Sequence, residues 1–206
     1  MSEIKVNKIS PTSGGGTVTL ATSGDTIQIP SGVTIANSGT ATGFGGGGKL
    51  GQVVAVHHTA QESTSSTTFV DVPSIVVAIT PTAASSKIMV MYTLTVGVDD
   101  RQLCFNMLRD INGGGYAQVS MGDASGNNTR VNNAYSGTSY YWDYMPFSMS
   151  HQYLDTPSYS VGNAITYKLQ WRVLGDTSYI NSSRDQTNHV NYVRSPSQIS
   201  AWEILA

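Results

Sequence analysis

Histidines are the side chains of this sequence best suited to bind a metal ion, and they are few and scattered. The chain has four of them. His57 and His58 are neighbours, and neighbouring residues of a strand point to opposite faces, so the two cannot bind one metal together. His151 and His189 lie far away in the sequence. A three-fold axis could gather one histidine from each of three subunits, but polar or interface roles are favoured, and the sequence predicts no metal site.

Oxygen side chains at alternate positions suggest a calcium loop. Asp123, Ser125 and Asn127 have this spacing. A calcium loop also needs a distal glutamate, and Ala134 stands in its place. The pattern therefore favours a turn in which Asp and Asn side chains bond to the backbone.

Hydrolytic chemistry has little support in the sequence. There is no Gly-x-Ser-x-Gly motif of the kind that positions a serine nucleophile. Glycoside hydrolysis needs two carboxylates across a cleft, whereas scattered aspartates more often face water or cap turns. The aspartates in question are Asp143, Asp155, Asp176 and Asp185. We predict a protein that is not an enzyme and has no catalytic residues, with a carbohydrate-degrading enzyme as an alternative.

The glycine-rich stretch of residues 43–49 matches G-x-G-x-x-G and the first part of a P-loop. A P-loop continues with Ser or Thr and opens a helix, but here Leu50 follows and residues 52–56 read as a strand. A run of glycines satisfies any glycine pattern by chance. We expect a flexible hinge at residues 43–49 and no cofactor.

Charged residues make up only 12% of the chain, about half the usual share in soluble domains. The formal net charge is −2 with no basic tract, which argues against nucleic-acid binding. No run approaches the ~18 apolar residues that span a bilayer, and the start lacks the apolar core of a signal peptide, so we expect cytoplasmic synthesis without membrane insertion. A surface so poor in Lys and Glu suggests burial between subunits or contact with a polar partner.

Residues 1–42 predict an N-terminal arm built of short β-repeats. Apolar residues recur there in pairs spaced i, i+2, and glycines separate the pairs. One chain cannot bury such pairs alone, so copies would associate around an axis, and three chains are the preferred number. The alternative is a flexible tail whose alternation is accidental. The candidate contacts are Val18, Leu20, Ile27, Ile29, Val33 and Ile35.

Residues 50–206 predict an all-β head, an antiparallel β-sandwich of jelly-roll type. Ten strands alternate with Gly and Pro punctuation, and no segment has helical periodicity over three turns. Methionines on the second face of the strand at Lys87–Val98 suggest that this face is also covered, for example by another subunit. The expected strands are Gln52–His57, Thr67–Val72, Ile75–Thr80, Lys87–Val98, Gln102–Arg109, Gly115–Met121, Phe147–Leu154, Ala164–Leu174, Thr177–Asn181 and Gln198–Leu205.

The stretch from Gly122 to Tyr144 has the composition of a recognition loop. Rigid aromatic side chains provide contact area at low entropic cost, and small polar ones adapt their hydrogen bonds. Aromatic faces also suit sugar rings. The alternative is a subunit interface, where Tyr and Trp are enriched. A second polar loop, Asn181–Pro196, is a weaker candidate. The candidate receptor-binding residues are Asn127, Asn128, Asn132, Asn133, Tyr135, Tyr140, Tyr141, Trp142, Asp143 and Tyr144.

Short motifs at both ends of the chain carry a resemblance. They are residues 4–10 (Ile-Lys-Val-Asn-Lys-Ile-Ser) with the repeats that follow, and residues 167–172 (Tyr-Lys-Leu-Gln-Trp-Arg), 179–181 and 200–204. These resemble the small tail-fibre or virion-fibre appendage proteins of bacteriophages, marine phages especially. The resemblance implies a virion location and a homotrimer whose arm docks to other virion proteins. It also implies a β-sandwich tip that faces a glycan or protein of the host surface. A capsid decoration, cement or head-fibre protein is the alternative.

Overall fold

The structure is a computed structural model that describes residues 49–98, 102–136 and 145–205. The expected arm and most of the hinge lie outside the described residues. Within them, eleven strands form and no helix does. The strands are β1 (Leu50–His58), β2 (Glu62–Thr64), β3 (Val70–Ile79), β4 (Lys87–Gly97), β5 (Gln102–Ile111), β6 (Ala117–Val119), β7 (Asn133–Ser136), β8 (Phe147–Asp155), β9 (Ile165–Val173), β10 (Ser178–Ile180) and β11 (Ser197–Ile204).

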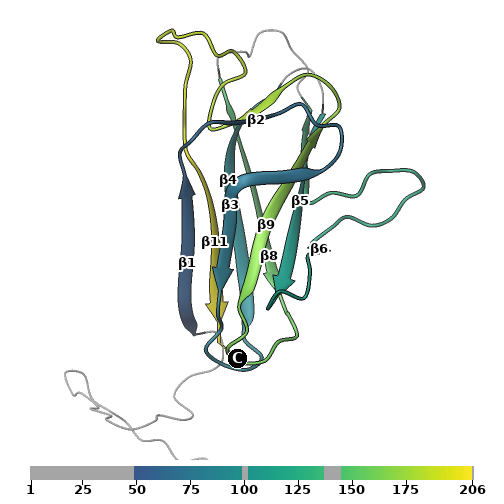
Figure 1. The fold of residues 1–206 in the computed structure, drawn as a ribbon, viewed down its shortest axis with the longest axis vertical. Coiled ribbons are helices and arrows are strands. Elements are labelled where there is room, and N and C mark those ends of the chain that lie inside the picture. Colours follow the sequence, from purple (N-terminus) through teal and green to yellow (C-terminus); the bar gives the residue numbers. More distant parts are fainter. Residues whose placement is uncertain (1–48, 99–101, 137–144, 206) are drawn as a thin grey trace, which may run out of the picture. The chain divides into compact units, whose positions relative to one another are not determined.

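The strands form two antiparallel sheets packed face to face (Figure 1). The first sheet runs β1-β11-β4-β8, and the short β10 and β2 extend it beside β4. The second runs β3-β9-β5, and β6 and β7 pair along the far side of β5. Four sets of paired strands lie one inside the other along the chain, as in a long hairpin that has been rolled up. They are β1 with β11, β3 with β9, β4 with β8, and β5 with β6 and β7. This is the jelly-roll sandwich that the sequence predicts.

Strand β3 covers what the sequence suggests are two strands, Thr67–Val72 and Ile75–Thr80. Pro73 cannot donate to the sheet, and Ser74 adopts a positive φ of 59°. The pairing with β9 shifts register between Asp71 and Val76, so the strand bends but continues. Strands β2 and β7 are not predicted, because neither segment has two large apolar residues spaced i, i+2 that would show a period of two.

Side chains of the two inner sheet faces form a single core. In β9 the alternation puts Ile165, Tyr167, Leu169 and Trp171 inside, each at most 1% exposed. In β4 it buries Ile88, Val90 and Leu94 in the same way. Burial of each large apolar side chain stabilises the fold by about 1.5–3 kcal/mol. Because these side chains point into the core, the side chains that alternate with them point away from it and form the outer faces of the two sheets.

The two ends of the described chain meet at one end of the sandwich. The Leu205 backbone N–H donates to the Lys49 carbonyl at 2.8 Å, and Leu50 lies opposite Ile204 across β1 and β11. Figure 1 shows the C-terminus at this same end. Residues 1–48 are therefore attached to the head beside the start of β1. None of the described residues belongs to a helix long and apolar enough to cross a membrane.

Candidate functional site

The outer face of the sheet β1-β11-β4-β8 is the candidate site. The strand registers align its outward side chains in three rows that cross all four strands. The rows are Val53, Trp202, Met89 and Leu154, then Ala55, Ser200, Met91 and Gln152, then His57, Gln198, Thr93 and Ser150. None of these side chains is Lys, Arg, Asp or Glu. A face without fixed charge suits contact with a protein or with an uncharged ligand better than contact with an ion.

Strand β11 turns Trp202 outward because its neighbour Glu203 points inward. The Glu203 side chain is fully buried, whereas Trp202 is 36% exposed. Buried carboxylates need partners, and this one accepts hydrogen bonds from the Thr82 N–H at 2.8 Å and the Ser86 hydroxyl at 2.9 Å. Gln52 Nε2 donates to it at 3.1 Å and the Ala83 N–H at 3.2 Å. The network anchors the turn before β4 and sets which face Trp202 occupies.

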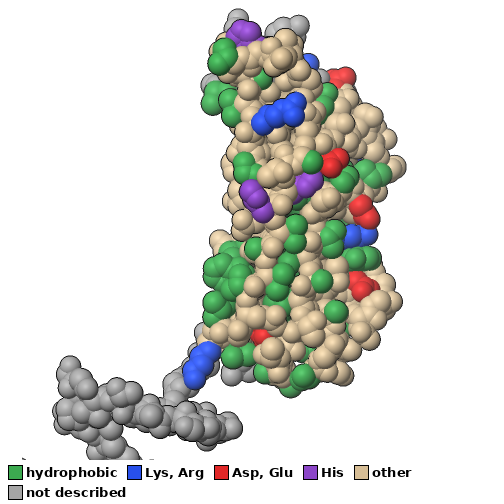
Figure 2. All heavy atoms as spheres, turned by 60° about the vertical axis from the view of Figure 1, so that its left-hand side comes forward, with side chains coloured by type: hydrophobic (Ala, Val, Ile, Leu, Met, Phe, Trp, Pro, Cys, Tyr) green, Lys and Arg blue, Asp and Glu red, His purple; other side chains and the backbone are tan. Residues whose placement is uncertain are grey.

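The first row is the most apolar part of the face. Leu154 is 44% exposed and Val53 48% exposed, and Met89 is half-buried. Leu50, 52% exposed, and Ile204 continue this end of the face beyond Val53. Figure 2 shows hydrophobic side chains gathered on the β1 side of the sandwich, below two histidines. The methionines of β4, expected to be covered, are only partly covered in the single chain.

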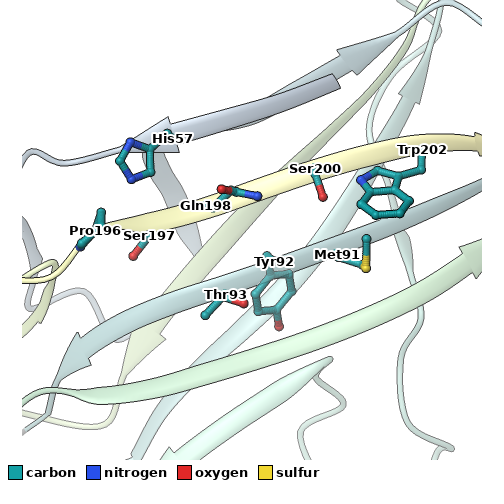
Figure 3. A pocket seen from close by; sticks show the side chains of 9 residues that line it. All are labelled: His57, Met91, Tyr92, Thr93, Pro196, Ser197, Gln198, Ser200 and Trp202. Atoms are coloured by element: carbon teal, nitrogen blue, oxygen red, sulfur yellow. The ribbon is translucent and has the colours of Figure 1, made fainter. Parts of the chain in front are cut away.

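A groove of about 380 Å³ crosses the face over β11 and β4 (Figure 3). Trp202 and Met91 lie together at one end, and His57 and Pro196 lie at the other. Gln198 and Ser200 stand between them on β11. The residues that line the groove are His57, Met91, Tyr92, Thr93, Pro196, Ser197, Gln198, Ser200 and Trp202.

The groove has groups that can bind a ligand, but its lining residues include no pair of groups suited to acid–base catalysis. An indole ring offers a flat apolar surface, and amide, hydroxyl and imidazole groups offer hydrogen bonds. Tyr92 contributes little because its side chain is only 2% exposed, and burial raises the pKa of its phenol far above the ordinary value. The carboxylate nearest along β11, Glu203, lies on the opposite face.

The expected recognition residues are only partly within the described chain. Asn127 and Asn128 are exposed in the turn between β6 and β7, where the Asn128 N–H donates to the Ser125 carbonyl at 3.0 Å. Tyr135 lies on β7 and packs its ring on Phe147, with 4.6 Å between centroids. Tyr140, Tyr141, Trp142, Asp143 and Tyr144 lie outside the described residues, as do the arm contacts Val18, Leu20, Ile27, Ile29, Val33 and Ile35.

Two of the expected recognition residues hold strands of the sandwich together. The Asn132 amide accepts from the Met107 N–H and donates to the Val119 carbonyl at 2.7 Å and to the Ser120 carbonyl, so it bridges β5 and the end of β6. Asn133 Nδ2 donates to the Ser150 carbonyl at 3.1 Å and links β7 to β8 of the other sheet. Both amides have partners within the head, in contrast to those of the exposed turn.

The groups considered for chemistry are dispersed. His57 is exposed and His58 is buried, as expected for neighbours on a strand. Asp155 is buried and paired with Arg109, while Asp185 accepts from the Thr187 and Tyr192 hydroxyls at 2.7 and 2.9 Å. Those hydrogen bonds, from Thr187 first, lower the pKa of Asp185. Among the described residues, no three His, Cys, Asp or Glu side chains are grouped to hold a metal ion.

The second loop, which follows β10, begins with a residue that has several hydrogen bonds to other segments, and its later residues line a polar hollow. The Asn181 amide donates to the His58 carbonyl at 2.9 Å and the Ala60 carbonyl at 2.8 Å, and accepts from the Ser197 hydroxyl at 2.6 Å. Farther along, residues of the loop line a hollow of about 410 Å³. They are Gln186, Thr187, Asn188, His189, Tyr192 and Arg194.

Sequence reasoning missed Trp202, Val53 and Leu154 as members of one surface. The signal that could have found part of it is the alternation of β4, which places Met89 and Met91 on the second face. Nothing local links these methionines to Trp202 or Leu154, which are more than sixty residues away in sequence. Only the sheet register places them side by side.

The strand order defines a jelly-roll β-sandwich protein. No protein-family model and no curated protein matches the chain. Among solved structures, it is similar to that of the infectious bursal disease virus Gt strain, with 17% identity and a TM-score of 0.35 over 86% of this chain and 43% of the other. A VP2 subviral particle of the same virus gives 12% identity and a TM-score of 0.33 over 75% and 38%. The chain thus spans about two fifths of each matched chain, and at these values the likeness assigns no function.

Proposed function

We propose that this chain is a structural component of a bacteriophage particle, a trimeric protein of the tail-fibre type. In this proposal the arm, residues 1–42, associates with its copies and docks to other virion proteins. Residues 43–49 act as the hinge. The jelly-roll head projects and binds a glycan or protein of the host surface.

The observation that carries the proposal is the lack of fixed charge in three rows of side chains on the outer face of the first sheet. Twelve outward side chains in three rows include no Lys, Arg, Asp or Glu. A free monomer commonly keeps such a face charged to prevent association. The low charge of the whole chain, 12%, agrees with a protein that works within an assembly. Jelly-roll domains are frequent in viral capsids and in lectins, which is consistent with either half of the role.

Host recognition in this proposal uses the loop from Gly122 to Tyr144. Its described turn extends from the sandwich with Asn127 and Asn128 exposed. The sequence adds four aromatic residues between positions 140 and 144. Exposed amides and aromatic faces are the groups that proteins use to hold sugar hydroxyls and sugar rings.

Three measurements test the proposal. Light scattering of the full chain on a sizing column should give three times the mass of one chain. Purified full chain added to host cells should then compete with phage particles and reduce their adsorption. Immunogold labelling of particles locates the protein: label at the tail tip supports the fibre role. Label spread over the capsid, without competition for adsorption, would replace that role with a decoration or cement protein.

A further inference from the structure

The uncharged face is graded along its strands from an apolar end to a polar end. We name the apolar end the apolar band, defined by Leu50, Val53, Met89, Leu154, Trp202 and Ile204. The rows that follow contain mainly Ser, Thr, Gln and His side chains. Rows on one face of a strand are about 7 Å apart, so the change from one character to the other occurs within roughly 14 Å.

The band is continuous across the sheet. Val53 lies opposite Trp202, Trp202 opposite Met89, and Met89 opposite Leu154, each on the neighbouring strand. Side chains directly opposite each other on neighbouring strands have Cβ atoms about 5 Å apart, so the four form one contact surface. Leu50, Val53 and Leu154 are each more than two fifths exposed in the single chain. Contiguous exposed apolar surface of this kind marks a place where another molecule binds.

The attachment of the arm favours a second copy of this chain as that molecule. Residues 1–48 join the head at Lys49, whose carbonyl accepts the Leu205 N–H beside the band. If the arms associate, the heads are tethered at their apolar ends, and a short tether gives a local concentration of about millimolar. The polar rows lie farther from the tether. Each copy brings the same band, whose six side chains carry no charge. Lys87, which lies opposite Ile204 at the edge of the band, is exposed and can keep its ammonium group in water when two bands meet.

We infer that the apolar band packs against the head of a second copy and that Trp202 is the central aromatic residue of this contact. The inference rests on the proposed oligomeric function. It assigns the polar end of the face, around His57, Thr93 and Gln198, to solvent or to a ligand. Trp and Met are enriched at the centres of such interfaces, and Lys and Glu are depleted there.

The test is photo-crosslinking of the full chain. Trp202→p-benzoylphenylalanine keeps an aromatic side chain in the band and captures any neighbour within reach. Tyr116→p-benzoylphenylalanine is the control, because Tyr116 is 45% exposed and belongs to the other sheet's side of the sandwich. We expect about tenfold more chain–chain product from position 202 than from position 116.

A second substitution tests whether the band itself makes the contact. Met89→Glu, added to the position 202 variant, should lower the chain–chain product by about tenfold, because it places a charge at the centre of an apolar contact. Thr93→Glu, on the same strand in the polar row, should change the product by less than about twofold. Circular dichroism and thermal unfolding confirm that each variant is folded.

The outcomes separate this inference from the proposed function. Equal product from positions 202 and 116, with a trimeric mass by light scattering, overturns the inference and leaves the fibre proposal standing. Product that Thr93→Glu lowers as strongly as Met89→Glu also overturns it, because the contact would then not be confined to the band. A monomeric full chain without product overturns both.

Discussion

The guanidinium of Arg109 ties the two sheets together by donating from Nη1 to both carboxylate oxygens of Asp155 at 2.8 Å. Arg109 lies on β5 of the second sheet, and Asp155 ends β8 of the first. The Tyr167 hydroxyl adds a hydrogen bond to Asp155 Oδ2 at 2.7 Å. Burial, followed by the charge of Asp155, raises the pKa of Tyr167 well above its ordinary value, so this hydroxyl remains a donor.

Asp155→Asn should lower the free energy of unfolding by about 2–4 kcal/mol, because it leaves the partly buried Arg109 without its counter-charge. Urea unfolding at pH 7 measures this loss. The control is Lys168→Met, which removes the ion pair with the exposed Asp71. That change should cost about 0–1 kcal/mol. Equal losses for the two variants would contradict an inter-sheet role for Asp155.

Glu203 should make stability depend on pH in the acid range. Burial acts to raise its pKa, but hydrogen bonds from Ser86, Thr82, Gln52 and Ala83 outweigh burial and lower the pKa below its ordinary value of 4.5. The folded protein therefore favours the charged form. The stabilisation is complete above about pH 4.5 and is lost as pH falls through the lower pKa of the folded state.

Glu203→Gln should cost about 1–3 kcal/mol of unfolding free energy at pH 7, because N–H and O–H donors lose a charged acceptor. The difference from the unsubstituted protein should shrink as pH falls from about 4.5, where the carboxyl group of the unfolded chain takes up a proton, through the lower pKa of Glu203 in the folded state. Urea unfolding at pH 3, 4, 5 and 7 measures this difference. A constant difference over that range would contradict the assignment.

Asn132 and Asn127 should behave differently although both belong to the predicted recognition loop. Asn132→Ala removes the amide that bridges β5 and β6 and should cost about 1–3 kcal/mol of unfolding free energy. Asn127→Ala, in the exposed turn, should change stability by less than about 0.5 kcal/mol. Thermal unfolding provides the comparison. In the adsorption assay, a loss of competition without a loss of stability should appear for Asn127→Ala only.

Replacement of both Tyr140 and Trp142 by Ala should weaken binding of the full chain to host cells by about tenfold or more, because buried aromatic anchors carry much of the affinity of such contacts. The trimeric mass should be unchanged. Tyr116→Ala, which removes an exposed aromatic residue elsewhere, serves as the control. Dissociation of the oligomer would show that the aromatic cluster is a subunit interface.

The amino-acid sequence by itself determined the class of the fold. The period of two along Lys87–Gly97 and Ile165–Val173, and the Gly and Pro residues between strands, are local features, so they predict strands and a sandwich without knowledge of pairing. The same alternation placed Met89 and Met91 on the outer face of β4. In the sequence, Pro73 indicates a strand end, because a bulge at a proline can be recognised only when the partner strand is known.

Only the tertiary structure decided which side chains share a surface. Val53, Met89, Leu154 and Trp202 come from four separated segments, and the register of β1, β11, β4 and β8 alone aligns them. In β11, hydropathy would place Trp202 inside and Glu203 outside, but the donors of residues 82–86 hold the carboxylate within the sandwich and turn the indole outward. Pairing registers and buried hydrogen-bond networks are non-local, and for that reason the candidate site emerged from the fold.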